Sequence, residues 1–286
     1  MVSLHQEARA ALRQFDFRPR KKLGQHFLVH DTVLEAILRL LEPSGQDEIL
    51  EIGPGLGFLT RRLVETAARV WAIEVDPLLA ERLRQSPLGS HPAFNLIEGD
   101  VLKVSFDSFL PGRRVKLAAN LPYSISTPVL FRIFELRKHF SVLVLMVQRE
   151  VAERMAASPG TKAYGTLSVW CQIHGRILGR VSVSPEAFFP RPKVKSTVLK
   201  LALYSEPRLA EETLPVLRGV VRAAFGQRRK TLSNALGSWL KKSRGEVKAL
   251  LEREGIDPKR RGETLSVDEF IRLAHALEKT ELTAES

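Results

Sequence analysis

The chain has 286 residues, of which 44% are hydrophobic, and its 44 Lys and Arg outnumber its 32 Asp and Glu to give a net charge of +12. This length fits one large or two moderate domains, and the hydrophobic content excludes a disordered or low-complexity protein. The positive charge indicates a polyanionic partner. A single cysteine, Cys171, excludes an internal disulfide framework and a multi-thiolate metal cluster, so we expect a reducing, cytoplasmic setting and no metal.

Neither a targeting segment nor a membrane span is predicted. The first residues mix charged with apolar side chains and lack the apolar run of a signal peptide. The longest apolar runs, such as residues 141–147, have the length of strands, whereas a spanning helix needs about 20 apolar residues. We therefore expect no membrane partner.

The first two-thirds of the chain alternates helical patterns with apolar runs. Residues 31–41 have apolar side chains at helical spacing, and residues 59–66 and 78–85 leave room for crossover helices. The runs that read as strands are residues 49–52, 70–75, 94–97, 115–119 and 142–147. Such runs, nearly free of charge, are typical of strands buried on both faces of a parallel sheet. The expected fold class is α/β, with a doubly wound, mostly parallel sheet.

The pattern changes in the last third. Two further strands are predicted at residues 177–183 and 197–204, and Pro185, Pro190 and Pro192 predict a rigid, exposed loop between them. Beyond residue 205 only helical spacing remains. These predicted helices comprise residues 209–225, 230–240, 246–253 and a last helix from about 266, where Ser266 and Glu269 form a capping box. We therefore predict a catalytic domain at residues 1–204 and a small helical domain at residues 205–286.

A glycine-rich turn, Gly53-Pro54-Gly55-Leu56-Gly57, follows the first of the buried strands and opens a helix. Glycines let the backbone turn tightly and let a ligand approach closely. Glu74 lies 21 residues after Gly53, where a carboxylate can accept hydrogen bonds from ribose hydroxyls. The Gly-x-Gly-x-Gly spacing, with Pro54 in place of a phosphate-cradling amide, favours S-adenosylmethionine over a dinucleotide. Asp100, at the end of the third strand, can accept a hydrogen bond from the exocyclic amine of adenine.

Asn120-Leu121-Pro122-Tyr123 stands at the end of the fourth strand, at the sheet edge where ligands bind in open α/β sheets. An exocyclic amine is a poor nucleophile because its lone pair is delocalised into the ring. The Asn120 side-chain carbonyl and the main-chain carbonyl of Leu121 or Pro122 can accept its hydrogens and favour a tetrahedral nitrogen. Tyr123 can stack on a base that has left its own stack. Positioning and desolvation then supply most of the catalysis.

The segment Asn-Leu-Pro-Tyr-Ser-Ile-Ser at residues 120–126 is similar to the signature of the ribosomal RNA adenine N6,N6-dimethyltransferases. Further segments resemble that family in the same order: residues 22–28, 146–154, 164–169, 188–196 and 225–232. The matches cover residues 21–236, and the likeness is closest to the bacterial enzymes of the small ribosomal subunit.

This resemblance implies methyl transfer from S-adenosylmethionine to two adjacent adenosines in the 3′-terminal hairpin of small-subunit (16S) ribosomal RNA, with a role in subunit biogenesis. It implies a monomer that acts on an immature 30S particle. The implied cofactor contacts are His26, where many relatives carry Asn, and Leu28, Gly53, Glu74, Asp100 and Asn120. Tyr123 and Phe188 would sandwich the target adenine, with Phe189 as a competitor for the second face.

Basic clusters beside the proline loop and in the helical region predict RNA contacts. The candidates are Arg191, Lys193, Lys195, Arg228, Arg229 and Lys230. Residues 205–286 hold 16 basic and 13 acidic residues, a net of +3, which leaves +9 for the rest of the chain. The basic surface is therefore expected to frame the adenine pocket as well as to tether the RNA.

Two alternative functions remain at this point. One is a large-subunit (23S) adenine methyltransferase of the macrolide-resistance type, which has a similar Asn-x-Pro-Tyr motif. The proline loop and the Gln-Arg-Arg-Lys-Thr-Leu segment at residues 227–232 favour the small-subunit enzyme. The other is a non-catalytic ribosome assembly factor, against which the intact Glu74, Asp100, Asn120 and Tyr123 speak.

Overall fold

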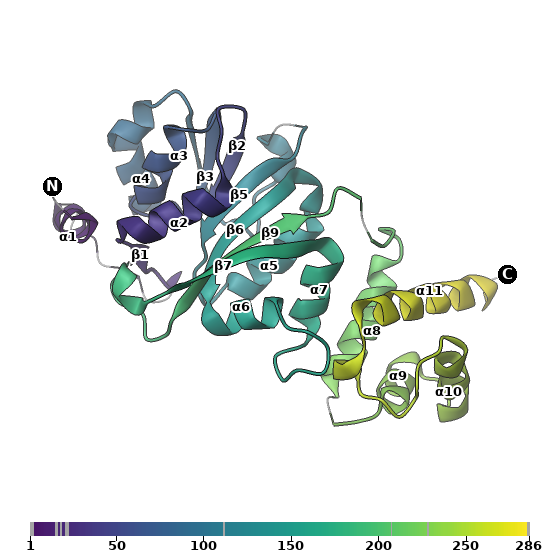
Figure 1. The fold of residues 1–286 in the computed structure, drawn as a ribbon. Coiled ribbons are helices and arrows are strands. Elements are labelled where there is room, and N and C mark those ends of the chain that lie inside the picture. The colour runs from purple at the N-terminus through teal and green to yellow at the C-terminus, as the bar shows by residue number, and fades with distance from the viewer. Residues whose placement is uncertain are drawn as a thin grey trace. The chain divides into compact units, whose positions relative to one another are not determined.

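The computed structural model describes residues 3–14, 17, 19–20, 23–110, 112–206, 208–227 and 229–284. The chain divides into two compact units (Figure 1). Unit 1 comprises Met1–Ala152 and Arg176–Leu203, and unit 2 comprises Glu153–Gly175 and Tyr204–Ser286.

Unit 1 is built on a seven-stranded sheet of order β4-β3-β2-β5-β6-β9-β7. Its strands are β2 (Glu48–Ile52), β3 (Arg69–Glu74), β4 (Phe94–Glu98), β5 (Val115–Asn120), β6 (Phe140–Gln148), β7 (Gly175–Val183) and β9 (Ser196–Leu203). The pairs from β4 to β6 are parallel, and β9 runs antiparallel to β6. Strands β2 and β5 are neighbours at the point where the chain switches direction across the sheet. The predicted doubly wound, mostly parallel α/β fold is thus confirmed.

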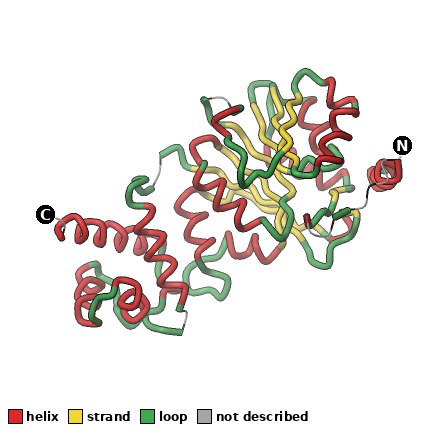
Figure 2. The backbone as a smooth tube through the Cα atoms, turned by 180° about the vertical axis from the view of Figure 1, so that it is seen from behind, coloured by secondary structure: helices red, strands yellow, loops and turns green. Residues whose placement is uncertain are grey.

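Helices lie on both faces of this sheet, as the two opposite views show (Figure 1, Figure 2). They are α2 (Asp31–Leu41), α3 (Phe58–Val64), α4 (Pro77–Gln85), α5 (Ser126–Glu135) and α6 (Arg149–Met155), with α1 (Leu4–Gln14) at the N-terminal end. Short 3-10 turns follow at Pro87–Ser90, Phe106–Ser108, Arg137–His139 and Pro185–Ala187. Because helices cover both faces, most residues of β2, β5 and β6 are buried, which explains their nearly uninterrupted apolar runs.

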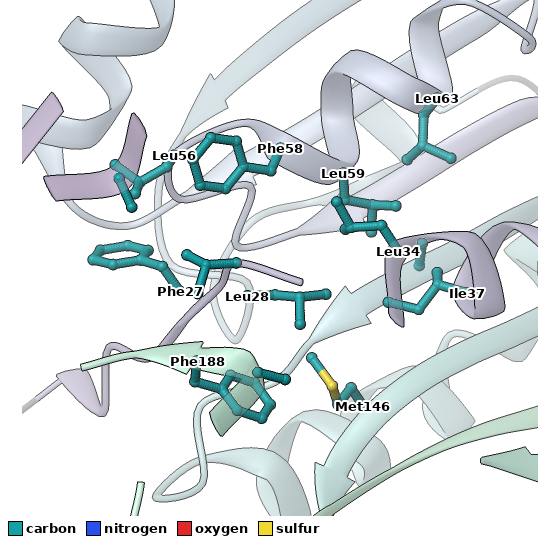
Figure 3. Packing of buried hydrophobic residues seen from close by; sticks show 14 of the residues in the cluster. Phe27, Leu28, Leu34, Ile37, Leu56, Phe58, Leu59, Leu63, Met146 and Phe188 are labelled. Atoms are coloured by element: carbon teal, nitrogen blue, oxygen red, sulfur yellow. The ribbon is translucent and has the colours of Figure 1, made fainter. Parts of the chain in front are cut away.

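A two-stranded antiparallel ladder joins two distant segments of unit 1. Strand β1 (Phe27–Leu28) pairs with β8 (Phe188–Phe189), with Leu28 opposite Phe188. Figure 3 shows both side chains within a cluster that also contains Met146. The proline loop is therefore less exposed than predicted, because Phe188 and the preceding Ala187 are 2% and 3% exposed.

Unit 2 is helical, with α7 (Thr166–His174), α8 (Leu214–Gly226), α9 (Leu232–Leu240), α10 (Arg244–Arg253), a 3-10 turn at Gly262–Thr264 and α11 (Val267–Ala284). The predicted capping box before the last helix is present. The Ser266 N–H donates to Glu269 Oε2 at 2.7 Å, and the Glu269 N–H donates to Ser266 Oγ at 3.2 Å. Because both bonds satisfy N–H groups at the helix end, they fix where α11 begins.

The contacts place Glu153–Gly175 with the C-terminal helices, whereas the sequence pattern predicts them within the domain of residues 1–204. The reason lies in α7, whose Val169 and Ile173 belong to the same buried cluster as Leu217 and Phe270. The local sequence of α7 does not reveal which neighbour its apolar side chains will meet. In the described part of the chain, no helix is both long and apolar enough to span a membrane.

Candidate active site

A cavity of about 210 Å³ opens at the carboxyl ends of β2, β3, β4 and β5. This is the crevice where open α/β sheets bind ligands, beside the switch between β2 and β5. The sequence-predicted residues that line it are His26, Gly53, Glu74, Asp100, Asn120, Leu121, Pro122 and Tyr123. Most of the site residues predicted from the sequence therefore line one cavity.

The glycine turn after β2 depends on backbone conformations that favour glycine. Gly53, Gly55 and Gly57 have φ angles of +70°, +57° and +80°. A Cβ at Gly55 would meet the Phe27 ring at 3.0 Å, so this position also needs a small residue for packing. The three glycines thus allow the turn to curl beneath the cavity before α3 starts.

The Glu74 carboxylate holds this turn in place. Its Oε2 accepts a hydrogen bond from the Gly55 N–H at 3.0 Å, and its Oε1 accepts one from the Asp76 N–H at 2.9 Å. Glu74 is 4% exposed, and burial raises its pKa despite these two bonds. The carboxylate therefore connects the end of β3 to the glycine turn and lines the cavity at the same time.

Asp76 and Gln25 support the same corner and were not singled out from the sequence. Asp76 Oδ1 accepts a bond from the Leu78 N–H at 3.1 Å and caps α4. Asp76 Oδ2 accepts a bond from Gln25 Nε2 at 2.8 Å, which ties the N-terminal segment to β3. The Asp before Pro77 is a recognisable cap signal, whereas no local pattern indicates the bond to Gln25.

Apolar side chains complete the lining. Val75, Val101 and Leu102 line the cavity directly after the two strand-end carboxylates. Val75 is 46% exposed, which is high for a valine that follows a buried strand. Their position immediately after Glu74 and Asp100 is the sequence signal that could have identified them.

The Asn120 carboxamide is held by the main chain of the N-terminal segment. Its Nδ2 donates to the His26 carbonyl oxygen at 2.9 Å, so Oδ1 is the acceptor that this side chain offers to a ligand. The Leu121 N–H donates to the Met146 carbonyl at 3.0 Å, and the Pro122 carbonyl accepts from the Ile125 N–H at 3.1 Å. These bonds fix the turn that carries the predicted catalytic motif.

Tyr123 and His26 form an aromatic wall. Their ring centroids are 5.6 Å apart with an interplanar angle of 29°. His26 Nδ1 lies 2.7 Å from the Pro190 carbonyl oxygen, and because a carbonyl only accepts, Nδ1 carries the proton. The Tyr123 hydroxyl hydrogen-bonds with Ser196 Oγ at 2.6 Å, and burial raises the pKa of Tyr123. The wall is thus anchored to the middle of the proline loop at Pro190 and to Ser196, where the loop ends and β9 begins.

Leu28 and Phe188 lie beside this cavity. Leu28 lines a second space of about 40 Å³, which shares Gly53, Gly55 and Asn120 with the larger one. Phe188 packs in the buried cluster of Figure 3 and does not line the larger cavity. Its neighbour Phe189 is half-buried, with the His5 ring 5.1 Å away and the Arg9 guanidinium 5.5 Å from its ring centre. Which phenylalanine faces the adenine stays a prediction.

The residues predicted to contact RNA differ in their ion pairing. Arg191 forms an ion pair with Glu186, whereas Lys193 and Lys195 are exposed in the same loop of unit 1. Arg229 and Lys230 are exposed in unit 2, and Arg228 lies outside the described residues. Salt bridges of exposed residues are weak, so Arg191 can exchange its carboxylate for a phosphate.

The sequence was compared with known protein families and with solved structures. The sequence matches the family described as Ribosomal RNA adenine dimethylase over residues 16–279. The chain belongs to the ribosomal RNA adenine dimethylase family. This membership confirms the expectation of an adenine-dimethylating enzyme of ribosomal RNA, drawn from the motifs at residues 22–28, 120–126 and 188–196.

Relatives in the family share most of the chain. Ribosomal RNA small subunit methyltransferase A of Geobacter metallireducens is 46% identical over 264 residues, which cover 91% of this chain and 96% of that protein. The protein of the same name from Clostridium botulinum is 43% identical over 269 residues, 92% of this chain and 96% of its own length.

Two solved structures have the same architecture. A dimethyladenosine transferase from Plasmodium falciparum superposes with a TM-score of 0.78 at 26% identity and covers 90% of this chain and 98% of its own. The 23S rRNA methyltransferase ErmE superposes with a TM-score of 0.66, also at 26% identity, and covers 88% of this chain and 99% of its own. Both support the methyltransferase fold of this family member.

Proposed function

We propose that the protein transfers methyl groups from S-adenosylmethionine to the N6 amines of two adjacent adenosines in the 3′-terminal hairpin of 16S ribosomal RNA. The observation that carries this proposal is the Asn120 carboxamide, which lines the cavity beside the switch between β2 and β5 and is held by the His26 carbonyl. Its Oδ1 can accept a hydrogen bond from the target amine, which must be made nucleophilic before it can take a methyl group. Identities of 43% and 46% to small-subunit enzymes, against 26% to ErmE, favour the small-subunit RNA.

The residues around the cavity suit S-adenosylmethionine. In this proposal the Glu74 carboxylate accepts hydrogen bonds from the ribose diol, and adenine lies against Val75, Val101 and Leu102, all of which line the cavity. Asp100 Oδ1 accepts a bond from the Leu102 N–H at 2.9 Å, which leaves Oδ2 for the exocyclic amine of the cofactor. We assign the methionine end to the side of His26, Leu28 and Gly53.

In the reaction we assign to this site, two carbonyl oxygens accept the hydrogens of the target amine. One is Asn120 Oδ1, and the other is the Leu121 main-chain oxygen. We assign this role to the Leu121 oxygen because that of Pro122 already accepts a bond from the Ile125 N–H. The cofactor supplies an activated methyl group, so no strong base is needed and the N6 proton can leave to solvent. Tyr123 holds the extruded base by stacking.

The partners follow from the charge. Phosphates of the RNA would contact Lys193 and Lys195 beside the pocket in residues 1–204, and Arg229 and Lys230 in the helical region of residues 205–286. We propose an immature 30S particle as the physiological substrate, a monomer as the active form, the cytoplasm as its location and a contribution to subunit maturation as the outcome.

The test is methyl incorporation from labelled S-adenosylmethionine into immature 30S particles. Asn120→Ala should reduce transfer at least a hundredfold and leave RNA binding within about twofold, because a lost transition-state contact costs about 3 kcal/mol while affinity rests on phosphates. Equal loss of both would show that Asn120 maintains the fold and is not the catalytic amide. Absence of transfer by the folded wild type would refute the proposed function.

Two further outcomes separate the alternatives. Methylation of 23S in place of 16S RNA, found by mapping the modified base, would assign the protein to the large-subunit type that the sequence offers as the alternative. Rescue of subunit maturation by Asn120→Ala would reveal an assembly role that does not depend on chemistry.

A further inference from the structure

The hydroxyl of Ser196 reaches the aromatic wall of the cavity from an adjacent strand. Ser196 is the first residue of β9, which runs antiparallel to β6 with Gln148 opposite Ser196. Because β6 is parallel to β5, the start of β9 lies at the same sheet edge as Asn120, two strands away. Ser196 Oγ and the Tyr123 hydroxyl are 2.6 Å apart.

The two partners of this bond differ in how firmly they are held. Ser196 is 0% exposed, its strand is paired with β6 from Ser196 to Ala202, and the preceding Lys195 carbonyl accepts from the Arg149 N–H at 3.0 Å. Tyr123 stands in a turn outside regular structure and is only half-buried. The hydrogen bond therefore restrains the Tyr123 side chain, which stands in a turn, by tying it to a residue that the sheet holds in place.

The position of Tyr123 matters because its ring has two faces. One face lies against the His26 ring, with centroids 5.6 Å apart, and the cavity is lined by both residues. A hydrogen bond at the far end of the ring prevents it from swinging about its Cβ. Without that bond the ring would keep the contact with His26 but lose a fixed orientation toward the cavity.

We propose that Ser196 is a positioning residue, which orients Tyr123 for stacking on the target adenine without contacting either substrate. This inference rests on the proposed function, since it assigns Ser196 a part in that same reaction. Ser196 is not among the described residues that line the cavity, so its effect passes through the Tyr123 hydroxyl. It also links the adenine pocket to the loop that carries Lys193 and Lys195, which ends where β9 begins.

The experiment compares Ser196→Ala, Tyr123→Phe and the double variant in methyl transfer to immature 30S particles. Each single variant should lower kcat about tenfold, because loss of orientation at the reacting base is costly even for a small displacement. The double variant should be no slower than the slower single variant, since both remove the same bond. The KM for S-adenosylmethionine should change less than twofold.

Further measurements distinguish a positioning role of Ser196 from a purely structural one. Ser168→Ala removes an equally buried hydroxyl in unit 2, where Ser168 Oγ donates to the Arg154 carbonyl, and should leave kcat unchanged whatever it does to the melting temperature. A 30S particle with 2-aminopurine at the target position reports stacking directly. Its fluorescence should change in the same direction with Ser196→Ala as with Tyr123→Phe, and Ser196→Thr, which retains the hydroxyl, should restore kcat.

Several outcomes would overturn this assignment while the proposed function stands. These are a kcat for Ser196→Ala within twofold of wild type, single effects that multiply in the double variant, or 2-aminopurine fluorescence that only Tyr123→Phe alters. Failure of the proposed function looks different, because wild type and Ser168→Ala would then both lack methyl transfer.

Discussion

Glu51 carries a buried carboxyl group two residues before Gly53, and its ionisation should make stability depend on pH. The residue is 2% exposed, and its Oε2 accepts a hydrogen bond from the Thr60 hydroxyl at 2.7 Å. Burial raises the pKa of Glu51 from 4.5 to about 7, and the neighbouring Glu74 adds to the rise. The folded protein therefore binds the Glu51 proton more tightly than the unfolded chain does.

The sign and size of the effect follow from this difference. Because the folded state holds the extra proton, the free energy of unfolding falls as pH rises from 4.5 toward 7 and stays low above it. A pKa difference of about 2.5 corresponds to about 3 kcal/mol in total. Between pH 5 and pH 8 the wild type should thus lose between about 2 and 3 kcal/mol through this group.

Glu51→Gln removes the charge and keeps an oxygen that can accept from Thr60. Its stability, measured by urea unfolding with tryptophan fluorescence, should be close to that of wild type near pH 5 and higher by about 2 kcal/mol at pH 8. Glu65→Gln, which removes an exposed carboxylate at the end of α3, is the control for loss of one charge. Parallel pH profiles for Glu51→Gln and wild type, or a variant less stable at pH 8, would refute this reasoning.

Two further predictions concern the glycine turn and the net charge. Gly55→Ala, at a φ of +57° and with its Cβ 3.0 Å from the Phe27 ring, should weaken S-adenosylmethionine binding at least tenfold in calorimetry, and unchanged affinity would show that the turn can relax. RNA affinity should fall steeply between 50 and 200 mM salt while S-adenosylmethionine affinity changes little, because only the former releases counterions. An RNA affinity that does not change with salt would show that the basic residues do not contribute to RNA binding.

The strands of the sheet could be predicted because burial on both faces leaves a strong local signature. Each predicted strand from residues 49–52 to 142–147 overlaps an observed one, with ends that differ by at most two residues. The ladder between β1 and β8 was missed, since two-residue strands carry no periodicity. The assignment of α7 to the helical unit was missed for another reason. Its apolar residues are compatible with either core, and only tertiary contacts decide between them.

In the candidate site, too, features within one segment could be predicted, whereas contacts between distant segments could not. Spacing within one segment revealed the glycine turn, Glu74 and the motif that begins at Asn120. The bond between Tyr123 and Ser196 joins residues 73 positions apart, so no pattern within either segment contains it. Phe188 is a different case, because a motif identified it but gives no side-chain orientation. The ladder with β1 buries its ring beside Leu28, outside the larger cavity.

The main chain holds the polar groups of this site, which has a consequence for how the sequence can vary. Glu74 is fixed by the N–H groups of Gly55 and Asp76, and Asn120 is fixed by the carbonyl of His26. None of these bonds depends on the side chain of the partner. An Asn in place of His26, which the resemblance indicates for many family members, would therefore keep the bond that orients Asn120. What such a change removes is the ring stacked on Tyr123. Substitution at position 26 should thus alter how the adenine is held more than how its amine is activated.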